Sequence, residues 1–234
     1  MRVKIKFTKN SELVENNQKH VNKYIHKCLI PEGWEQNKYH DTWSNYVITR
    51  MMGGKVSGRY IDYPNGGFIV VSSPSFEFID VLINGVFSNP EFGFGMKFED
   101  IEFITEEFHN GWNHFRTTET GIMLKKHKEN GRVTYYKLDD CDFEESLKNH
   151  TLKKLKKINS NLDFSDFEVS IKKHPAHKTR RIFIKNVENW VNVCQVSIYC
   201  NKEVAEYVYN YGLGQSTGSG MGLVYKTENI HLYR

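Results

Sequence analysis

Apolar positions in the first half of the chain repeat with two different periods. Residues 2–8 alternate between apolar and polar side chains, which predicts a strand, whereas residues 18–30 repeat apolar side chains at helical spacing until Pro31. Ser75 is expected to be the N-cap of a second helix. The predicted elements are, in order, strand 2–8, helix 18–30, strands 46–51, 58–62 and 68–72, helix 73–87 and strand 101–108.

The second half repeats this order more loosely. Its predicted elements are strands 115–125 and 132–138, helix 143–158, strands 167–173, 181–184 and 191–199, helix 201–211, a glycine-rich segment and strand 223–226. Each half contains β-α-β-β-α-β, the order of a ferredoxin-like domain. We expect an α+β chain of two tandem ferredoxin-like domains, residues 1–112 and 113–234, with the boundary within 110–114. Two such domains side by side create a central cleft, and sheet faces and loops of this kind often hold single-stranded nucleic acid.

Length and composition are those of a globular protein. The chain has 234 residues, of which 39% are hydrophobic and 14% aromatic, so it can bury one large or two small cores. No stretch approaches the roughly 20 apolar residues of a membrane span, and the alternating start of the chain is unlike a signal peptide. We therefore expect a cytoplasmic protein that does not enter a membrane.

Cysteine and histidine spacing gives no sign of a metal site. The four cysteines lack CxxC spacing and stand in apolar stretches, so we expect reduced core residues at Cys28, Cys141, Cys194 and Cys200. The ten histidines include no HExxH or comparable spacing. The sequence therefore supports neither a metal nor another cofactor.

Positive charge is concentrated in two places. The net charge of +4 weakly favours a polyanionic partner. One cluster lies on or beside neighbouring strands of the second half and comprises Lys172, Lys173, Lys178, Arg180 and Arg181. In helix 143–158 the apolar stripe of Leu147, Leu152, Leu155 and Ile158 is expected to be buried, which predicts a solvated outer face for Lys153, Lys154, Lys156 and Lys157.

A glycine-rich segment separates the last predicted helix from the last predicted strand. It reads Gly212-Leu-Gly214-Gln-Ser-Thr-Gly218-Ser-Gly220-Met-Gly222, with five glycines in eleven residues. Closely spaced glycines can expose successive amide groups that cradle an anion such as phosphate; a flexible turn is the plain alternative. P-loops and dinucleotide fingerprints run instead from strand to helix and require residues that this segment lacks, so both are excluded.

A helix, this glycine pattern and a terminal strand together resemble the C-terminal signature of the CRISPR-associated endoribonucleases of the RAMP superfamily, which cut precursor CRISPR RNA at its repeats. The family pattern, glycine-hydrophobic-glycine repeated after a few residues, is matched by Gly212, Gly214, Gly220 and Gly222, while Gly218 stands where a small polar residue is frequent. Residues 78–91 look like the family's second helix, with its Asn-Gly and Asn-Pro phrase. Residues 2–7 and 46–55 look like two of its strands.

This resemblance implies two tandem ferredoxin-like domains, RNA cleavage without metal, and recognition of single-stranded or hairpin CRISPR repeat RNA partly through the glycine segment. His40 occupies the position of a loop histidine found in many members. Some members combine this histidine with a tyrosine in the first helix and a lysine after the loop. In this sequence His26, two residues after Tyr24, stands at the tyrosine position, and the lysine position lies near Asn45, so the family's triad is not intact. The resemblance leaves room for a homodimer and for association with a CRISPR effector complex.

The residues present could carry out such a cleavage. A base takes the proton of the 2′-hydroxyl, the oxygen attacks the adjacent phosphorus, and an acid protonates the departing 5′-oxygen, leaving a cyclic phosphate and a 5′-hydroxyl. Imidazoles suit either task near neutral pH, so His40 and His26 are the first candidates. Tyr24 and Tyr39 could orient the ribose or act as base, and residues of the basic cluster are expected to contact backbone phosphates.

Two other functions compete with this interpretation. The tripeptides His40-Asp-Thr42 and His177-Lys-Thr179 resemble the paired HxT motifs of two-histidine phosphoesterases, although polar Asp41 and Lys178 replace the usual apolar residue. The second competitor is a relative that holds guide RNA without cutting it, because fold does not determine function.

Overall fold

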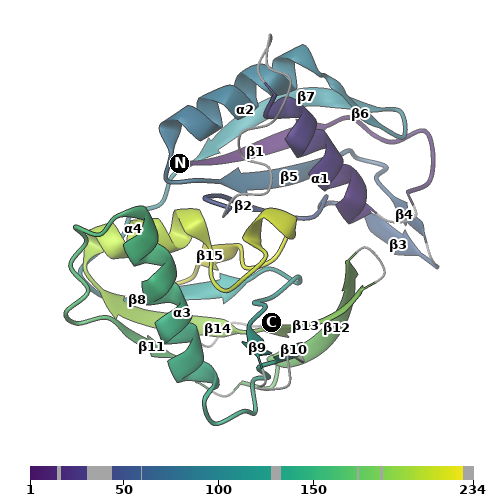
Figure 1. Ribbon diagram of the computed structural model, residues 1–234. Coiled ribbons are helices and arrows are strands. Elements are labelled where there is room, and N and C mark those ends of the chain that lie inside the picture. Colours follow the sequence, from purple (N-terminus) through teal and green to yellow (C-terminus); the bar gives the residue numbers. More distant parts are fainter. Residues whose placement is uncertain are drawn as a thin grey trace. The chain divides into compact units, whose positions relative to one another are not determined.

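The computed structural model describes residues 1–14, 17–30, 44–58, 60–127, 133–172, 174–184 and 187–228. The chain forms two compact units (Figure 1). The first comprises Met1–Thr105 with Gly218–Gly220, and the second comprises Glu106–Thr217 with Met221–Arg234. This division lies a few residues before the boundary expected from the sequence, because Gly111 and Trp112 already belong to a strand of the second unit.

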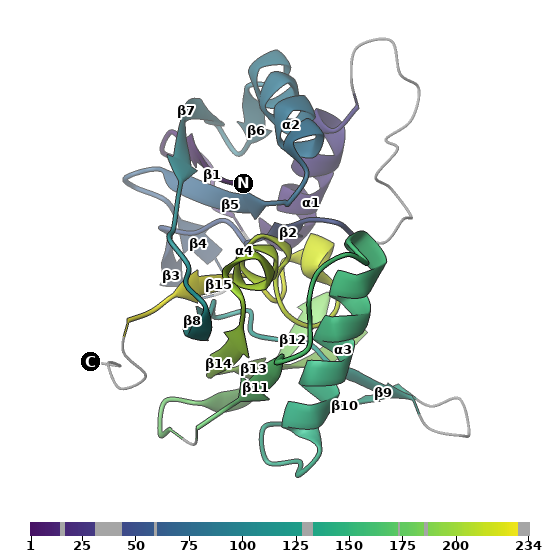
Figure 2. The ribbon, with the colours of Figure 1, turned by 90° about the vertical axis from the view of Figure 1, so that its left-hand side faces the viewer.

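The sheet of the first unit has the ferredoxin-like strand order. Its elements are β1 (Arg2–Phe7), α1 (Asn17–Cys28), β2 (Val47–Ile48), β5 (Gly67–Ser72), α2 (Phe76–Ser88), β6 (Glu91–Gly93) and β7 (Met96–Ile104). The strands are ordered β2-β5-β1-β7-β6 and pair antiparallel. A separate hairpin joins β3 (Lys55–Ser57) to β4 (Tyr60–Asp62). Both helices lie on the same face of the sheet (Figure 2).

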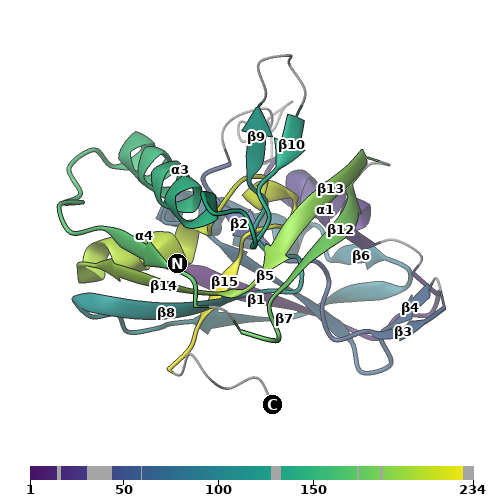
Figure 3. The same ribbon diagram turned by 90° about the horizontal axis from the view of Figure 1, so that it is seen from below.

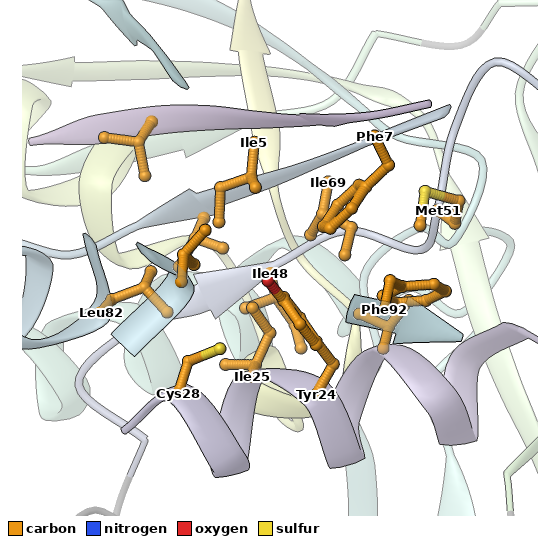
Figure 4. Packing of buried hydrophobic residues seen from close by; sticks show 14 of the residues in the cluster. Ile5, Phe7, Tyr24, Ile25, Cys28, Ile48, Met51, Ile69, Leu82 and Phe92 are labelled. Carbon is orange, nitrogen blue, oxygen red and sulfur yellow. The ribbon is translucent and has the colours of Figure 1, made fainter. Parts of the chain in front are cut away.

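Local sequence explains the main elements of this unit. In β1 the apolar residues Val3, Ile5 and Phe7 are buried beneath the helices, as the period-two alternation predicts. Ser75 caps α2 as expected, because its side chain accepts a hydrogen bond from the amide of Phe78. Figure 4 shows the resulting core, in which side chains from α1 point toward those from the sheet.

The second unit has the same strand order with two inserted hairpins. Its sheet is ordered β11-β14-β8-β15, from β8 (Gly111–Thr117), β11 (Glu168–Ser170), β14 (Gln195–Cys200) and β15 (Val224–Lys226). Helices α3 (Phe143–Ile158) and α4 (Lys202–Tyr211) cover one face (Figure 3). The insertions are β9 (Lys125–His127) with β10 (Val133–Tyr135), and β12 (Lys178–Ile184) with β13 (Val187–Val193). A short 3-10 turn covers Thr217–Ser219.

Two strands predicted in this unit are divided or interrupted in the structure, and the others differ only in where they begin or end. The predicted strand 191–199 is divided at Cys194 into β13, which pairs with β12, and β14, which pairs with β8 and β11. The predicted strand 115–125 is interrupted after Thr117 by a turn closed by a hydrogen bond from the Gly121 amide to the Thr118 carbonyl. Strand-forming residues run through the break at Cys194, so sequence alone shows no change of partner there, whereas Gly121 marks the turn that the prediction of strand 115–125 overlooked.

Other expectations concern cysteines and membrane spans. All four cysteines are free; Cys28, Cys194 and Cys200 are buried as predicted, whereas Cys141 is exposed, which corrects the expectation of a core residue there. Within the described residues, no helix combines the length and the apolar character that crossing a membrane requires.

Candidate functional site

The predicted catalytic residues are described only in part. His40 and Tyr39 lie outside the described residues. His26 lies in the last turn of α1 and is partly exposed. The catalytic roles of these three residues remain predictions.

Tyr24 is a core residue of the first unit. Its side chain is 4% exposed, its hydroxyl donates to the carbonyl oxygen of Asn89 at 3.0 Å, and its ring packs edge-on against Phe7 and Phe92. Figure 4 shows this ring pointing from α1 toward the sheet. Burial raises the pKa of the Tyr24 phenol above its usual range, which disfavours the phenolate. Its catalytic role remains a prediction, and its surroundings are those of a structural residue.

The glycine-rich segment is buried and uses much of its own hydrogen-bonding capacity. All five glycines are buried; Gly218 lies in the 3-10 turn and Gly220 directly after it. Five amides of the segment donate to carbonyl groups of the fold, namely those of Gly212, Leu213, Gln215, Met221 and Gly222. An anion held by this segment, as the sequence predicts, would therefore have to use its other amides.

Two of the glycines leave no room for a side chain. Gly214 has φ +74°, and a Cβ atom there would lie 2.5 Å from the carbonyl oxygen of Met123. Gly222 has φ +75°, and a Cβ atom there would lie 1.9 Å from the carbonyl oxygen of Leu213. Positive φ and close backbone approach both require glycine, so these two positions shape the segment whatever it binds.

Lys154 holds the start of this segment, which corrects the expectation of a solvated side chain. It is 4% exposed, and its ammonium donates to the carbonyl oxygens of Tyr211 at 2.9 Å, Gly212 at 3.3 Å and Gly214 at 3.5 Å. It also lies 4.1 Å from the centroid of the Tyr211 ring. Burial lowers the pKa of Lys154 to about 7, while the three carbonyls at the C-terminal end of α4 favour the charged form.

The position of Lys154 follows from helical spacing. Leu147, Thr151 and Leu155 are buried on α3, and Lys154 lies seven residues after Leu147 and three after Thr151 on the same stripe. His150 lies one turn before Lys154. Burial and the Lys154 charge lower the pKa of His150, and a hydrogen bond with the backbone of Gly214 raises it. Helical spacing alone would thus have predicted that Lys154 is buried. This was missed because only leucine and isoleucine residues were counted as the buried stripe.

The sheet face opposite α3 and α4 carries aromatic and basic side chains that sequence reasoning missed. Trp112, His114 and Arg116 alternate with buried neighbours along β8 and stand opposite Tyr199, Ser197 and Gln195 of β14. The Trp112 and Tyr199 rings are 5.4 Å apart and roughly two-fifths exposed. His114 Nδ1 and Ser197 Oγ lie 2.9 Å apart, and the Arg116 guanidinium lies 5.8 Å from the Tyr225 ring centroid. We call these residues the outer face of the second unit; the sequence conceals its period-two alternation, because apolar Trp112 is exposed and polar Asn113 is buried.

Such a face has the chemistry of a nucleic-acid surface. Unpaired bases stack on exposed aromatic rings, and positive side chains contact the phosphates between them. Burial and the charges of Lys172 and His109 lower the pKa of His114, so its imidazole is mainly neutral near pH 7. Positive charge on the outer face itself therefore comes from Arg116.

The structure divides the predicted basic cluster. Lys172 and Lys178 are exposed, whereas Lys173 lies outside the described residues. Arg180 forms an ion pair with Glu119 at 3.6 Å, and Arg181 forms one with Glu188 at 3.4 Å. Because adjacent residues of a strand alternate, Arg180 shares a face of β12 with Lys178 and Arg181 lies on the other face. RNA binding by these residues remains a prediction. Among the residues that the structure describes, no group of three or more potential ligands could hold a metal ion.

Comparison with known proteins places this geometry in a family. Residues 104–225 match the family model described as CRISPR associated protein Cas6, C-terminal. No curated protein sequence gives a significant match. This chain is similar in structure to a RAMP protein described as binding different RNA substrates, with a TM-score of 0.82, 20% identity, and coverage of 97% of this chain and 100% of that one.

Two further structures agree. One comes from the characterization of a Cas6-related gene from Pyrococcus furiosus, with a TM-score of 0.82, 20% identity, and coverage of 98% of this chain and 99% of that one. The other is a CRISPR associated protein Cas6, with a TM-score of 0.79, 18% identity, and coverage of 97% and 99%. Together with the strand order of both units, these matches confirm the predicted fold class of two tandem ferredoxin-like domains.

Proposed function

The chain belongs to the CRISPR-associated Cas6 family, and from this premise we propose that it is an endoribonuclease that cuts CRISPR repeat RNA without a metal ion. Family membership itself assigns the chain to CRISPR-associated RNA processing or binding. The proposal adds the chemistry: attack by a 2′-hydroxyl on the adjacent phosphorus, with a 2′,3′-cyclic phosphate and a 5′-hydroxyl as products. The observation that carries it is the family match over residues 104–225, which includes the whole glycine-rich segment.

In this mechanism His40 is the principal acid or base. Its imidazole can exchange a proton near neutral pH, which for a positioned group accelerates a reaction by about 10²- to 10⁴-fold. His26 is the proposed second imidazole, and Tyr39 and Tyr24 are the remaining members of the proposed set. The burial of Tyr24 makes it the least accessible of the four to substrate.

The proposed binding surface has three parts: the outer face, two exposed lysines of the second unit and the glycine-rich segment. The outer face supplies stacking rings at Trp112 and Tyr199 and a cation at Arg116. Exposed Lys172 and Lys178 supply further positive charge. The glycine-rich segment supplies backbone amides, in a shape that Gly214, Gly222 and Lys154 maintain. Together these groups support binding of a single-stranded ribose-phosphate chain.

A cleavage assay with the repeat RNA of its own CRISPR array tests this proposal. We expect cutting at one position in EDTA, with cyclic phosphate and 5′-hydroxyl ends, and no cutting when a single 2′-deoxy nucleotide replaces the attacking ribose. His40→Ala should lower the rate by at least about 100-fold. The matched control is His127→Ala, which removes an exposed histidine of β9 outside the proposed set. Cleavage that requires Mg²⁺, or that survives His40→Ala, would contradict the mechanism.

The same assay separates the two competing functions. Tight binding of repeat RNA without any cutting would favour a non-catalytic relative. Opening of small cyclic phosphates would favour the phosphoesterase, whose first tripeptide, residues 40–42, lies outside the described residues. In the second tripeptide His177 Nε2 accepts the Gln195 amide at 3.0 Å, and the Thr179 hydroxyl donates to Asn192 Oδ1 at 2.7 Å. Both groups therefore have structural partners, which disfavours a catalytic HxT pair.

A further inference from the structure

A pocket of about 540 Å³ lies in the second unit, beside the first residues of β12. Leu138, Ile171 and Pro175 form its apolar part, and His174, His177 and Lys178 form its polar part. Its volume falls in the range of about 300–1,000 Å³ that is usual for small-ligand pockets. No residue of the pocket belongs to the proposed catalytic set.

Backbone amides fix the protonation pattern of both pocket imidazoles. The Gln195 amide donates to Nε2 of His177 at 3.0 Å, so a neutral His177 carries its proton on Nδ1. The Ala176 amide donates to Nδ1 of His174 at 3.1 Å, so a neutral His174 carries its proton on Nε2. Burial and the neighbouring His174 lower the pKa of His177, which keeps it neutral near pH 7. Each ring therefore has a defined N–H donor.

The pocket is held in shape by hydrogen bonds between three chain segments. A turn closed from the His177 amide to the His174 carbonyl at 2.9 Å sets the two imidazole centroids 5.5 Å apart. Thr179 Oγ1 accepts the Leu138 amide at 3.3 Å and donates to Asn192 Oδ1 at 2.7 Å. These bonds connect the segment before α3 to both strands of the β12–β13 hairpin. A site built in this way needs little ordering when a ligand binds.

We propose that this pocket binds one unpaired nucleotide of an RNA, as a subsite separate from the cleavage site. The base would lie against the apolar part, formed by Leu138, Ile171 and Pro175. The His177 N–H group and the Lys178 ammonium would donate to phosphate oxygens or base acceptors. Asp139, which is exposed at the same pocket, would accept from an exocyclic amino group. RNA as the natural ligand rests on the proposed function, whereas binding of a free nucleotide does not.

Titration of the full-length protein with the four nucleoside 5′-monophosphates, followed by amide and imidazole NMR signals, tests the pocket directly. We expect saturable shifts at Ala176, Lys178 and Gln195 and in both rings for at least one nucleotide. Inorganic phosphate at equal concentration should not produce them. Absence of saturable shifts with all four nucleotides, or equal shifts with inorganic phosphate, would overturn the proposal.

Two variants examine the two halves of the pocket. Lys178→Met should weaken nucleotide binding by about two- to fivefold, the contribution usual for an exposed charge, while Lys202→Met, outside the pocket, should leave it unchanged. Ile171→Trp should fill the apolar part and abolish the shifts. If Ile171→Trp disturbs the fold, seen as changes throughout the spectrum, Lys178→Met decides the question. Wild-type affinity in Lys178→Met would overturn the proposal.

The nuclease proposal and the pocket proposal fail separately. Cleavage of repeat RNA without any nucleotide shift would overturn the pocket and keep the nuclease. Nucleotide shifts at the pocket without cleavage would overturn the nuclease and keep the pocket.

Discussion

The two units share one strand order, but their first strands, β1 and β8, carry different side chains on the face turned away from the helices. In the first unit, the outward residues Lys4 and Lys6 of β1 form ion pairs with Glu102 and Asp100 at 3.1–3.2 Å. In the second unit, the outward residues of β8 are Trp112, His114 and Arg116, beside the Tyr199 ring. The same topology thus yields a charge-neutralised face in one unit and a face suited to nucleic acid in the other. Side chains, and not strand order, therefore distinguish the sheet that we propose as an RNA-binding surface from the one that we do not.

The units also differ in how the last helix leads to the last strand of the sheet. In the first unit α2 ends at Ser88, and β6 and β7 follow as a hairpin. Between α4 and β15 the buried glycine-rich segment intervenes, fixed at its start by the Lys154 ammonium. A buried cation and the close approach of Gly214 and Gly222 to backbone carbonyl oxygens make this connection costly to alter, so it should be more sensitive to substitution than the connection in the first unit.

The largest expected effect is on stability, from Gly222→Ala. The variant combines positive φ with a Cβ atom only 1.9 Å from the Leu213 carbonyl oxygen, so we expect a loss of about 3 kcal/mol or more in the free energy of unfolding. Gly58→Ala in the first unit is the matched control, because φ is +59° there but nothing lies within 4 Å of the added atom. It should cost about 1 kcal/mol. Urea denaturation measures both, and equal losses would contradict the role of the close carbonyl contact at Gly222.

Lys154→Met should lower the free energy of unfolding by about 2–3 kcal/mol. The variant leaves the carbonyl groups of Tyr211, Gly212 and Gly214 without the donor that satisfies them. Lys19→Met, an exposed lysine of α1 in the first unit, should change stability by less than about 0.5 kcal/mol. A Lys154→Met protein as stable as the wild type would show that the ammonium does not hold the segment.

Removing an exposed aromatic ring should weaken RNA binding in the second unit but not in the first. Trp112→Ala should weaken binding of repeat RNA by roughly 10- to 100-fold, because stacking of one base on an aromatic ring contributes about 1–3 kcal/mol. Phe76→Ala removes a 74% exposed ring from α2 of the first unit and should leave affinity unchanged. Fluorescence anisotropy measures both. Equal weakening of RNA binding by the two variants would contradict the proposal that the outer face binds RNA.

The free energy of unfolding should depend on pH through the protonation of buried Lys154. The pKa of Lys154 is lowered to about 7 in the folded protein, against about 10.4 in an unfolded chain. Between these values the unfolded state binds more protons, so the contribution of Lys154 to stability rises with pH. The free-energy difference between wild type and Lys154→Met should therefore grow from pH 7 to pH 9, as measured by urea denaturation. A difference that shrinks over this range would show that the folded protein keeps the charge more firmly than free lysine.

The smallest expected effect is on the salt dependence of RNA affinity. Arg116→Ala should reduce the slope of log affinity against log salt concentration by about 1, as expected for one lost phosphate contact. Lys4→Ala should have little effect on this slope, because the Lys4 ammonium is already paired with Glu102 at 3.2 Å. Binding titrations between 50 and 200 mM salt measure both slopes, and a larger change for Lys4→Ala would reverse the assignment of surfaces.

Much of the fold could be predicted because its signals are local. The alternation in residues 2–8 led to β1, Ser75 was recognised as the cap of α2, and the glycine spacing from Gly212 to Gly222 pointed to the family. The candidate site was harder. Trp112 and Tyr199 are 87 positions apart and meet only because β8 pairs with β14 in one register.

The sequence by itself determined the order of most elements and the class of each unit, because period and caps are properties of short stretches of chain. The requirement for glycine at Gly214 and Gly222 was decided by the carbonyl groups of Met123 and Leu213 that they meet in the folded chain. Only the tertiary structure decided that Lys154 is buried, that the predicted strand 191–199 changes sheet at Cys194, and that His174 and His177 border a pocket. Each of these depends on which distant backbone groups come within hydrogen-bonding distance. That choice is made when helices and sheets pack together. Helical spacing places Lys154 on the buried stripe of α3, but the sequence of these residues does not show which distant groups they contact.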